Sequence, residues 1–180
     1  MYAITTAGRF VLATAVATSI AAVPAITVST AAQATPAAQV ATAHSAIAHS
    51  AIVTAWEQAW SGTDPARLGR LFTADGVYTD HAIGVTMNGR DQISGWKQRT
   101  DQMISDVQVR VLRSFRSGNH ITIESIYSGH IKGAPTPFAV PICTVLDLRH
   151  GKIAKNQDYY SLASVLAQSG LPADWTPGRQ

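Results

Sequence analysis

The stretch Val107–Ile131, VQVRVLRSFRSGNHITIESIYSGHI, decides the fold class of this chain. Apolar and polar residues alternate over Val107–Phe115 and again over Ile121–Ile131, which is the period of a strand with one buried face. Ser117-Gly118-Asn119 lies between the two segments and is a turn signal. The stretch therefore predicts an antiparallel hairpin.

The C-terminal part of the chain predicts a second pair of strands. Phe138–Leu148 is a long, mostly apolar segment, and Lys152–Tyr160 follows it after the turn residues His150-Gly151. A short helix is expected at Leu162–Gln168, and Gly170-Leu171-Pro172 ends it, because glycine and proline commonly stop helices.

Upstream of the first hairpin, the sequence predicts strands and a helix in alternation. Asp75-Gly76 is a turn signal, and Val77–Met87 then reads as two strand pieces joined at Gly84. A tight turn is expected at Asn88-Gly89, and Asp91 is expected to cap the helix that follows.

Two helices are expected at the start of the folded part. In His44–Ser61, apolar residues recur every three or four positions, which gives one apolar helix face, and Gly62 ends the segment. Asp64 with Pro65 then fits the N-cap and first position of a short second helix. The order is helix, helix, strand, helix and four more strands. It predicts an α+β fold with helices on one face of a curved antiparallel sheet.

The N-terminal segment has the layout of a secretory signal peptide. One basic residue lies in Met1–Arg9, Phe10–Val28 is largely apolar, and Ala32-Gln33-Ala34 supplies small residues for cleavage. A permanent membrane anchor is the alternative, but Pro24 interrupts the apolar segment. We therefore expect a secreted protein that has no membrane association after cleavage. The expected division is signal peptide 1–34, disordered spacer 35–43, folded domain 44–173 and tail 174–180.

The composition excludes several classes of function. The 180 residues suit one domain, and the net charge of +3 comes from bases scattered without a dense run, so nucleic acid is not an expected partner. Cys143 is the only cysteine, so the chain cannot form an internal disulfide. The six histidines lack the spacing of a metal pair, and no glycine-rich nucleotide loop occurs. We expect no metal and no cofactor.

A series of short motifs supports a family resemblance. The motifs are Ala55-Trp56 with Trp60, Leu71-Phe72-Thr73-Ala74-Asp75, Tyr78-Thr79-Asp80, Asn88-Gly89-Arg90-Asp91-Gln92-Ile93, Gly151-Lys152-Ile153 and Asp158-Tyr159-Tyr160. In this order they resemble the nuclear transport factor two-like superfold, and the tail resembles its SnoaL-like family. Relatives there include ketosteroid isomerase, limonene epoxide hydrolase and polyketide cyclase. The resemblance implies a cone-shaped α+β barrel, with a curved antiparallel sheet wrapped around a long N-terminal helix, and a mostly apolar pocket inside.

The resemblance also suggests two acid/base residues. Asp80 falls where ketosteroid isomerases keep an aspartate that moves a proton, and Asp158 falls where epoxide hydrolases and SnoaL-like cyclases keep an acid/base aspartate. The alternatives are a turn or capping role for Asp80 ahead of His81, and a structural hydrogen-bonding role for Asp158. Two carboxyls facing one apolar cavity could exchange protons near neutral pH.

Eight further residues are expected to line the pocket, although aromatic residues also fill ordinary cores. Strand parity and helix position select Trp56, Trp60, Tyr78, Trp96, Ser125, Tyr127, Thr144 and Tyr160. Their aromatic character favours a small apolar ligand over a sugar or phosphate.

The chain departs from its relatives at the residues that define their reactions. Trp56 stands where the isomerases have an oxyanion-hole tyrosine, and Thr144 lies near the position of their protonated aspartic acid. Ser125 and Tyr127 stand where epoxide hydrolases have an Arg and an Asp. The leading hypothesis is cofactor-independent acid/base chemistry of the isomerase, cyclase or hydratase type. A non-catalytic small-molecule-binding domain and a dimerisation module are the alternatives, and a homodimer, as in many relatives, is expected in any case.

Overall fold

The computed structural model describes residues 50–176. The predicted signal peptide, the spacer and the His44–His49 part of the first predicted helix lie outside the described residues. Within residues 50–176, no helix is long and apolar enough to cross a membrane.

Four helices are present among the described residues: α1 Ala51–Ser61, α2 Pro65–Leu71, α3 Gly89–Met103 and α4 Leu162–Gln168. The prediction of α2 is confirmed in detail, because Asp64 Oδ1 accepts the N–H of Ala66 at 3.0 Å and Pro65 is the first helical residue. Helix α1 buries Trp56, Ala59 and Trp60, which belong to the predicted apolar face, and it also buries Val53, which the prediction had not placed there.

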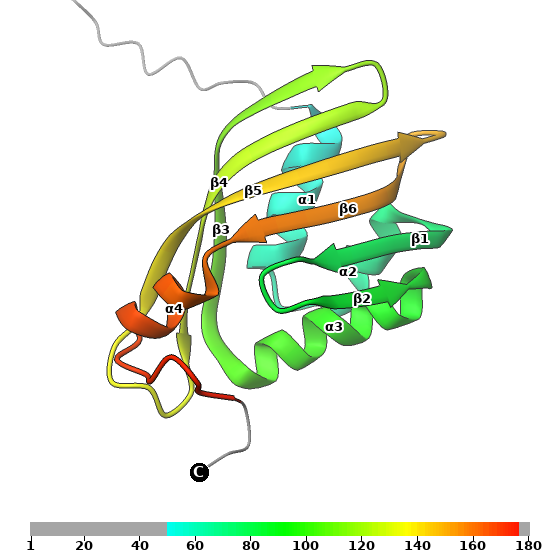
Figure 1. The fold of residues 1–180 in the computed structure, drawn as a ribbon. Helices are drawn as coiled ribbons and strands as arrows, with labels where there is room; N and C mark the ends of the chain where they lie inside the picture. Colours follow the sequence, from blue (N-terminus) through cyan, green and yellow to red (C-terminus); the bar gives the residue numbers. More distant parts are fainter. Residues whose placement is uncertain (1–49, 177–180) are drawn as a thin grey trace, which may run out of the picture. The chain divides into compact units, whose positions relative to one another are not determined.

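Within residues 50–176, six strands form one sheet: β1 Phe72–Asp80, β2 Val85–Asn88, β3 Ile104–Ser117, β4 His120–Ile131, β5 Phe138–Arg149 and β6 Lys152–Tyr160. Their order across the sheet is β2-β1-β6-β5-β4-β3 (Figure 1). The predicted α+β class is confirmed, with two differences of detail. The sheet does not close, since β2 and β3 occupy its two edges. One pair, β1 with β6, is parallel, whereas the expected sheet was antiparallel. Strand β2 pairs with one edge of β1, and β6 pairs with the other edge and runs in the same direction as β1.

Local predictions around β1 and α3 need correction. The predicted turn at Asp75-Gly76 lies within β1, where the register to β6 shifts between Phe72 and Val77, so the extra residues form an irregularity in a continuous strand. The predicted tight turn at Asn88-Gly89 is the start of α3. Asp91 lies in the first turn of that helix and does not cap it.

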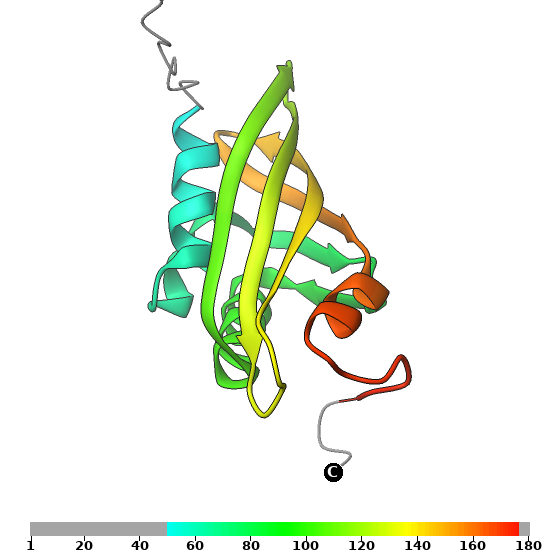
Figure 2. The same ribbon diagram turned by 90° about the vertical axis from the view of Figure 1, so that its left-hand side faces the viewer.

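The curvature of the sheet creates a concave face. Figure 2 shows this curvature, since β3 and β4 run steeply through the view while β1 and β2 run across it. The main core lies between this face and the first three helices, and Leu68, Phe72 and Ile153 are fully buried in it. Each such side chain stabilises the fold by roughly 1.5–3 kcal/mol. A second cluster, which includes Phe138 and Val165, packs α4 against β5.

Candidate functional site

A cavity of about 350 Å³ lies on the concave side of the sheet. Its size falls within the usual range of small-molecule sites. Its wall is formed by helices α1, α3 and α4, by every strand except β2, by the turn between β1 and β2, and by the segment after α4. The lining residues are Trp56, Trp60, Tyr78, Asp80, Ala82, Ile83, Trp96, Thr100, Met103, Ile104, Val109, Tyr127, Ile131, Phe138, Ile142, Asp158, Tyr160, Leu162, Val165, Leu166, Trp175 and Thr176.

Most of the residues selected from the sequence meet at this cavity. Those that line it are Asp80, Asp158, Trp56, Trp60, Tyr78, Trp96, Tyr127 and Tyr160. The predicted lining role of Ser125 and Thr144 is wrong. Both are short side chains with at most 1% exposure, and neither belongs to the cavity lining. Thr144 instead donates a hydrogen bond to Asp158, which does line the cavity.

The carboxyl group of Asp158 is held by three donors. Its Oδ1 accepts hydrogen bonds from Thr144 Oγ1 at 2.6 Å and from Asn156 Nδ2 at 2.8 Å, and its Oδ2 accepts one from the hydroxyl of Tyr78. Burial raises the pKa of Asp158 to about 6, although the three hydrogen bonds act in the opposite direction. A carboxyl with this pKa can change its protonation state near neutral pH.

Asp80 combines a structural role with a position in the cavity wall. Its Oδ1 accepts the backbone N–H groups of Ala82 at 3.0 Å and Ile83 at 3.3 Å, which closes the turn between β1 and β2. Its Oδ2 accepts the hydroxyl of Tyr160 at 3.0 Å. Burial raises the pKa of Asp80, and these hydrogen bonds oppose the rise. The two sequence interpretations of Asp80, turn residue and pocket residue, therefore both describe it.

The two carboxyls lie opposite each other on neighbouring strands. Asp80 on β1 is the register partner of Asp158 on the parallel strand β6, so both side chains leave the same face of the sheet. The charge of Asp80 contributes to the raised pKa of Asp158. Like charges placed directly opposite destabilise a sheet, and such arrangements are concentrated at functional sites. We expect the pair to titrate as a coupled unit.

Tyr127 adds a hydrogen-bond donor to the cavity. Its ring packs edge-on against Phe138 and Tyr160, with centroid distances of 5.1 and 5.8 Å. Burial and the nearby carboxyls raise the pKa of Tyr127 above its usual value, which keeps the hydroxyl protonated. Within residues 50–176 this hydroxyl has no hydrogen-bond partner, unlike those of Tyr78 and Tyr160. It is therefore available to a ligand.

Sequence reasoning missed Asn156. This side chain is fully buried, and its amide joins Trp56 on α1 to Asp158: Trp56 Nε1 donates to Asn156 Oδ1 at 3.0 Å. Strand parity places Asn156 on the same face as Asp158, but an asparagine on that face gives no sign of a contact with the distant helix α1, and it was not selected as a site residue.

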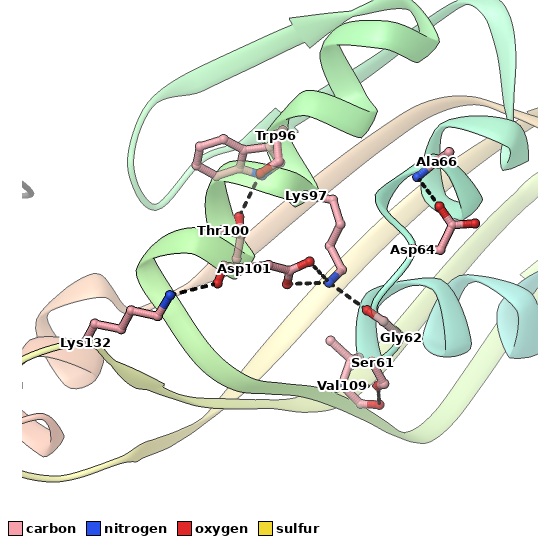
Figure 3. Close-up of polar contacts among 10 residues, drawn as sticks. All are labelled: Ser61, Gly62, Asp64, Ala66, Trp96, Lys97, Thr100, Asp101, Val109 and Lys132. Carbon is pink, nitrogen blue, oxygen red and sulfur yellow. Dashed lines mark hydrogen bonds and ion pairs between the residues drawn. The ribbon is translucent and has the colours of Figure 1, made fainter.

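Lys97 was missed as well, because lysine is almost never fully buried unless it is paired. Its side chain is 1% exposed, and Nζ donates to Gly62 O at 2.9 Å and to Asp101 Oδ2 at 2.7 Å (Figure 3). Nζ also lies 6.0 Å from the ring centroid of Trp60. Lys97 thus ties α3 to the end of α1, next to a tryptophan of the cavity wall.

The described residues include no group of three or more His, Cys, Asp or Glu side chains that could hold a metal ion. The carboxyl groups in the cavity lining are those of Asp80 and Asp158.

Comparison with known proteins places this fold in a family. The SnoaL-like domain model matches residues 53–156. A protein with a ketosteroid isomerase-like fold from Catenulispora acidiphila, solved in complex with trimethylamine, is 66% identical. The match covers 71% of this chain and 98% of that one, with a TM-score of 0.70.

More distant structures share the fold alone. A phenazine biosynthesis-related protein from Pseudomonas aeruginosa is 19% identical over 69% of this chain and 86% of its own, with a TM-score of 0.61. An LEH-like epoxide hydrolase from M. tuberculosis is 18% identical over 65% and 85%, with a TM-score of 0.56. None of the curated proteins matches this chain. The family model and the 66% identical structure together show that the chain belongs to the SnoaL-like family of the nuclear transport factor two-like superfold.

Proposed function

We propose that this protein is a cofactor-independent acid/base enzyme, of the isomerase, cyclase or hydratase type, that acts on a small apolar carbonyl compound. The observation that carries the proposal is the Asp158 carboxyl, which is 3% exposed, lies in the cavity wall and has a pKa raised to about 6. An ionised carboxylate with this pKa is a stronger base than an exposed one and remains ionised at pH 7.

The proposed reaction begins with proton transfer to Asp158. A C–H bond next to the carbonyl group breaks, an O–H bond forms on Asp158, and the electron pair moves to the carbonyl oxygen. The hydroxyl of Tyr127 donates a hydrogen bond to that oxygen, which stabilises its developing charge. In a substrate with a C=C bond next to the carbon that lost its proton, Asp158 returns the proton to the far carbon of that bond, the double bonds shift, the carbonyl re-forms and Asp158 is ionised again, which completes an isomerisation. If the opposite carboxyl of Asp80 delivers the proton instead, transfer of the proton from Asp158 to Asp80 restores both groups. The three donors on Asp158 hold it in one orientation throughout.

Hydrogen–deuterium exchange tests this step without knowledge of the natural substrate. The protein is incubated in D₂O with 3-cyclohexenone and a panel of small ketones, and deuterium incorporation is followed by NMR. We expect exchange faster than in buffer, and a loss of roughly 10²–10⁴-fold in Asp158→Asn. Asp106→Asn is the matched control, because Asp106 is an exposed aspartate on β3. Equal rates in Asp158→Asn and the control would exclude Asp158 as the base.

A second candidate function is non-catalytic binding of a small organic cation. The complex of the 66% identical relative with trimethylamine favours it. In this chain the cavity combines two carboxyls with tryptophan and tyrosine rings, and its lining includes no Lys, Arg or His. Carboxylates and aromatic faces both attract cations. Calorimetry with trimethylammonium chloride and with the neutral compound tert-butanol tests this candidate. Non-catalytic cation binding requires that trimethylammonium binds and tert-butanol does not, and that the protein causes no deuterium exchange in the ketone assay.

Export and dimerisation are part of the proposal. The layout of residues 1–34 supports export, and the family resemblance supports a homodimer. Mass spectrometry of the protein recovered from the culture medium would identify a processed N-terminus near residue 35 if export occurs. Light scattering coupled to gel filtration gives the oligomeric state, and a monomer across the concentration range would exclude the dimer.

A further inference from the structure

We infer that Trp56 and Asn156 form a positioning relay that fixes the orientation of Asp158 and leaves Oδ2 as the oxygen that takes up the proton. The inference rests on the proposed role of Asp158 as the base. Asn156 contacts Asp158 directly, and Trp56 contacts Asn156. The inference specifies which of the two carboxyl oxygens of Asp158 takes up the proton.

The relay begins with a group that can only donate. The indole Nε1–H of Trp56 has no acceptor capacity, and it donates to Asn156 Oδ1 at 3.0 Å. The amide oxygen of Asn156 must therefore face α1, and its NH₂ group must face the other way. There, Nδ2 donates to Asp158 Oδ1 at 2.8 Å. Trp56 is 1% exposed and Asn156 is fully buried, so water cannot replace either contact.

The fixed amide divides the two oxygens of Asp158 into different roles. Oδ1 accepts from both Asn156 and Thr144, which uses both of its acceptor positions. Oδ2 accepts only from Tyr78 and keeps one position free. If the amide of Asn156 turned over, its oxygen would face Oδ1 and favour a proton there. The N–H of Trp56 opposes this rotation, because it would then face an NH₂ group.

The relay should therefore be visible in the titration of Asp158 itself. The titratable groups around this carboxyl are Tyr78 and Asp80 on β1, Tyr127 on β4, Cys143 on β5 and Tyr160 on its own strand. Neither Trp56 nor Asn156 titrates, so substitutions at these positions change hydrogen bonding to Asp158 without removing a charge.

The experiment is a carbon-13 NMR titration of the Asp158 carboxyl in the full chain, with no ligand. We expect Asn156→Leu to raise the pKa by about one to two units, the size of one hydrogen bond to a charged group. Trp56→Phe keeps an aromatic ring and removes only the N–H, and we expect a rise of about half a unit or more. In the double variant, Trp56→Phe should add nothing to Asn156→Leu, because the tryptophan acts through the asparagine.

Trp60→Phe is the matched control. Trp60 lies one turn along α1 and also lines the cavity, but its buried Nε1 has no partner among the described residues. Removal of this N–H group in Trp60→Phe should leave the pKa of Asp158 unchanged.

The relay is wrong if Trp56→Phe folds, as judged by its amide NMR spectrum, and leaves the pKa at the wild-type value. It is equally wrong if Trp60→Phe produces the same shift as Trp56→Phe. If Asn156→Leu fails to fold, the comparison of Trp56→Phe with Trp60→Phe still decides the matter. The ketone exchange assay judges the base role separately, so either idea can fail alone.

Discussion

Removal of the Asp101 carboxylate should destabilise the fold through Lys97. The Lys97 side chain is 1% exposed and has two partners, the carboxylate of Asp101 and the carbonyl of Gly62. In Asp101→Ala the buried ammonium keeps only that carbonyl and the Trp60 ring at 6.0 Å. Breaking a buried pair costs about 3–5 kcal/mol. Since the Asp101 side chain itself is 31% exposed, we expect the lower end, about 3 kcal/mol.

Urea unfolding followed by tryptophan fluorescence measures this cost. A loss of about 3 kcal/mol corresponds to a fall in Tm of about 10 °C for a domain of this size. Lys97→Met should cost less than Asp101→Ala, because it removes the buried charge and leaves a carboxylate that water can reach. Arg113→Ala is the control, since its pair with Glu124 is exposed and should contribute less than about 1 kcal/mol. The reasoning is refuted if Asp101→Ala is no more destabilising than Arg113→Ala.

Three further predictions concern packing and protonation. Gly69→Ala should destabilise the fold by about 1–3 kcal/mol in urea unfolding, because its Cβ would lie 2.2 Å from Ser94 Oγ and 2.6 Å from a backbone oxygen of α3; wild-type stability would show that the helices can separate. Asp158 binds its proton more tightly in the folded state, with a pKa of about 6 against 3.8, so its contribution to stability is lost as the pH rises through this window. The difference in unfolding free energy between wild type and Asp158→Asn should therefore fall by about 2 kcal/mol from pH 4 to pH 6.5, and a flat difference would contradict the raised pKa. Tyr160→Phe removes a hydrogen bond that favours ionised Asp80, so NMR titration should give a higher pKa for Asp80 than in wild type, and an unchanged value would count against that bond.

The elements of this fold could be predicted from the sequence because their patterns are local. Period-two alternation located β3 and β4, and β6 and α4 have the predicted bounds of Lys152–Tyr160 and Leu162–Gln168. The parallel pairing of β1 with β6 could not be predicted in the same way. It joins residues such as Phe72 and Ile153, which are far apart in the chain, and no local pattern records which edge a strand will occupy.

The same distinction applies to the site. Strand parity and family resemblance identified Asp80 and Asp158, because both methods require only the position of a residue along its strand. They could not show that Thr144 lies behind the cavity wall or that Asn156 bridges a helix to a carboxyl. Those facts depend on the depth of each side chain within the packed sheet, and three elements must be assembled to define them.

The position of β6 between β5 and β1 has a consequence for the synthesis of this protein. As the chain leaves the ribosome, β1 and β2 emerge early, but β6 is the last strand to appear. Until it arrives, the free edge of β1 exposes unpaired backbone groups that another chain can bind. Pairing over such a sequence separation is also slow. Asp80 and Asp158 therefore cannot meet before β6 has been synthesised, and an N-terminal fragment that ends before β6 keeps this edge of β1 open.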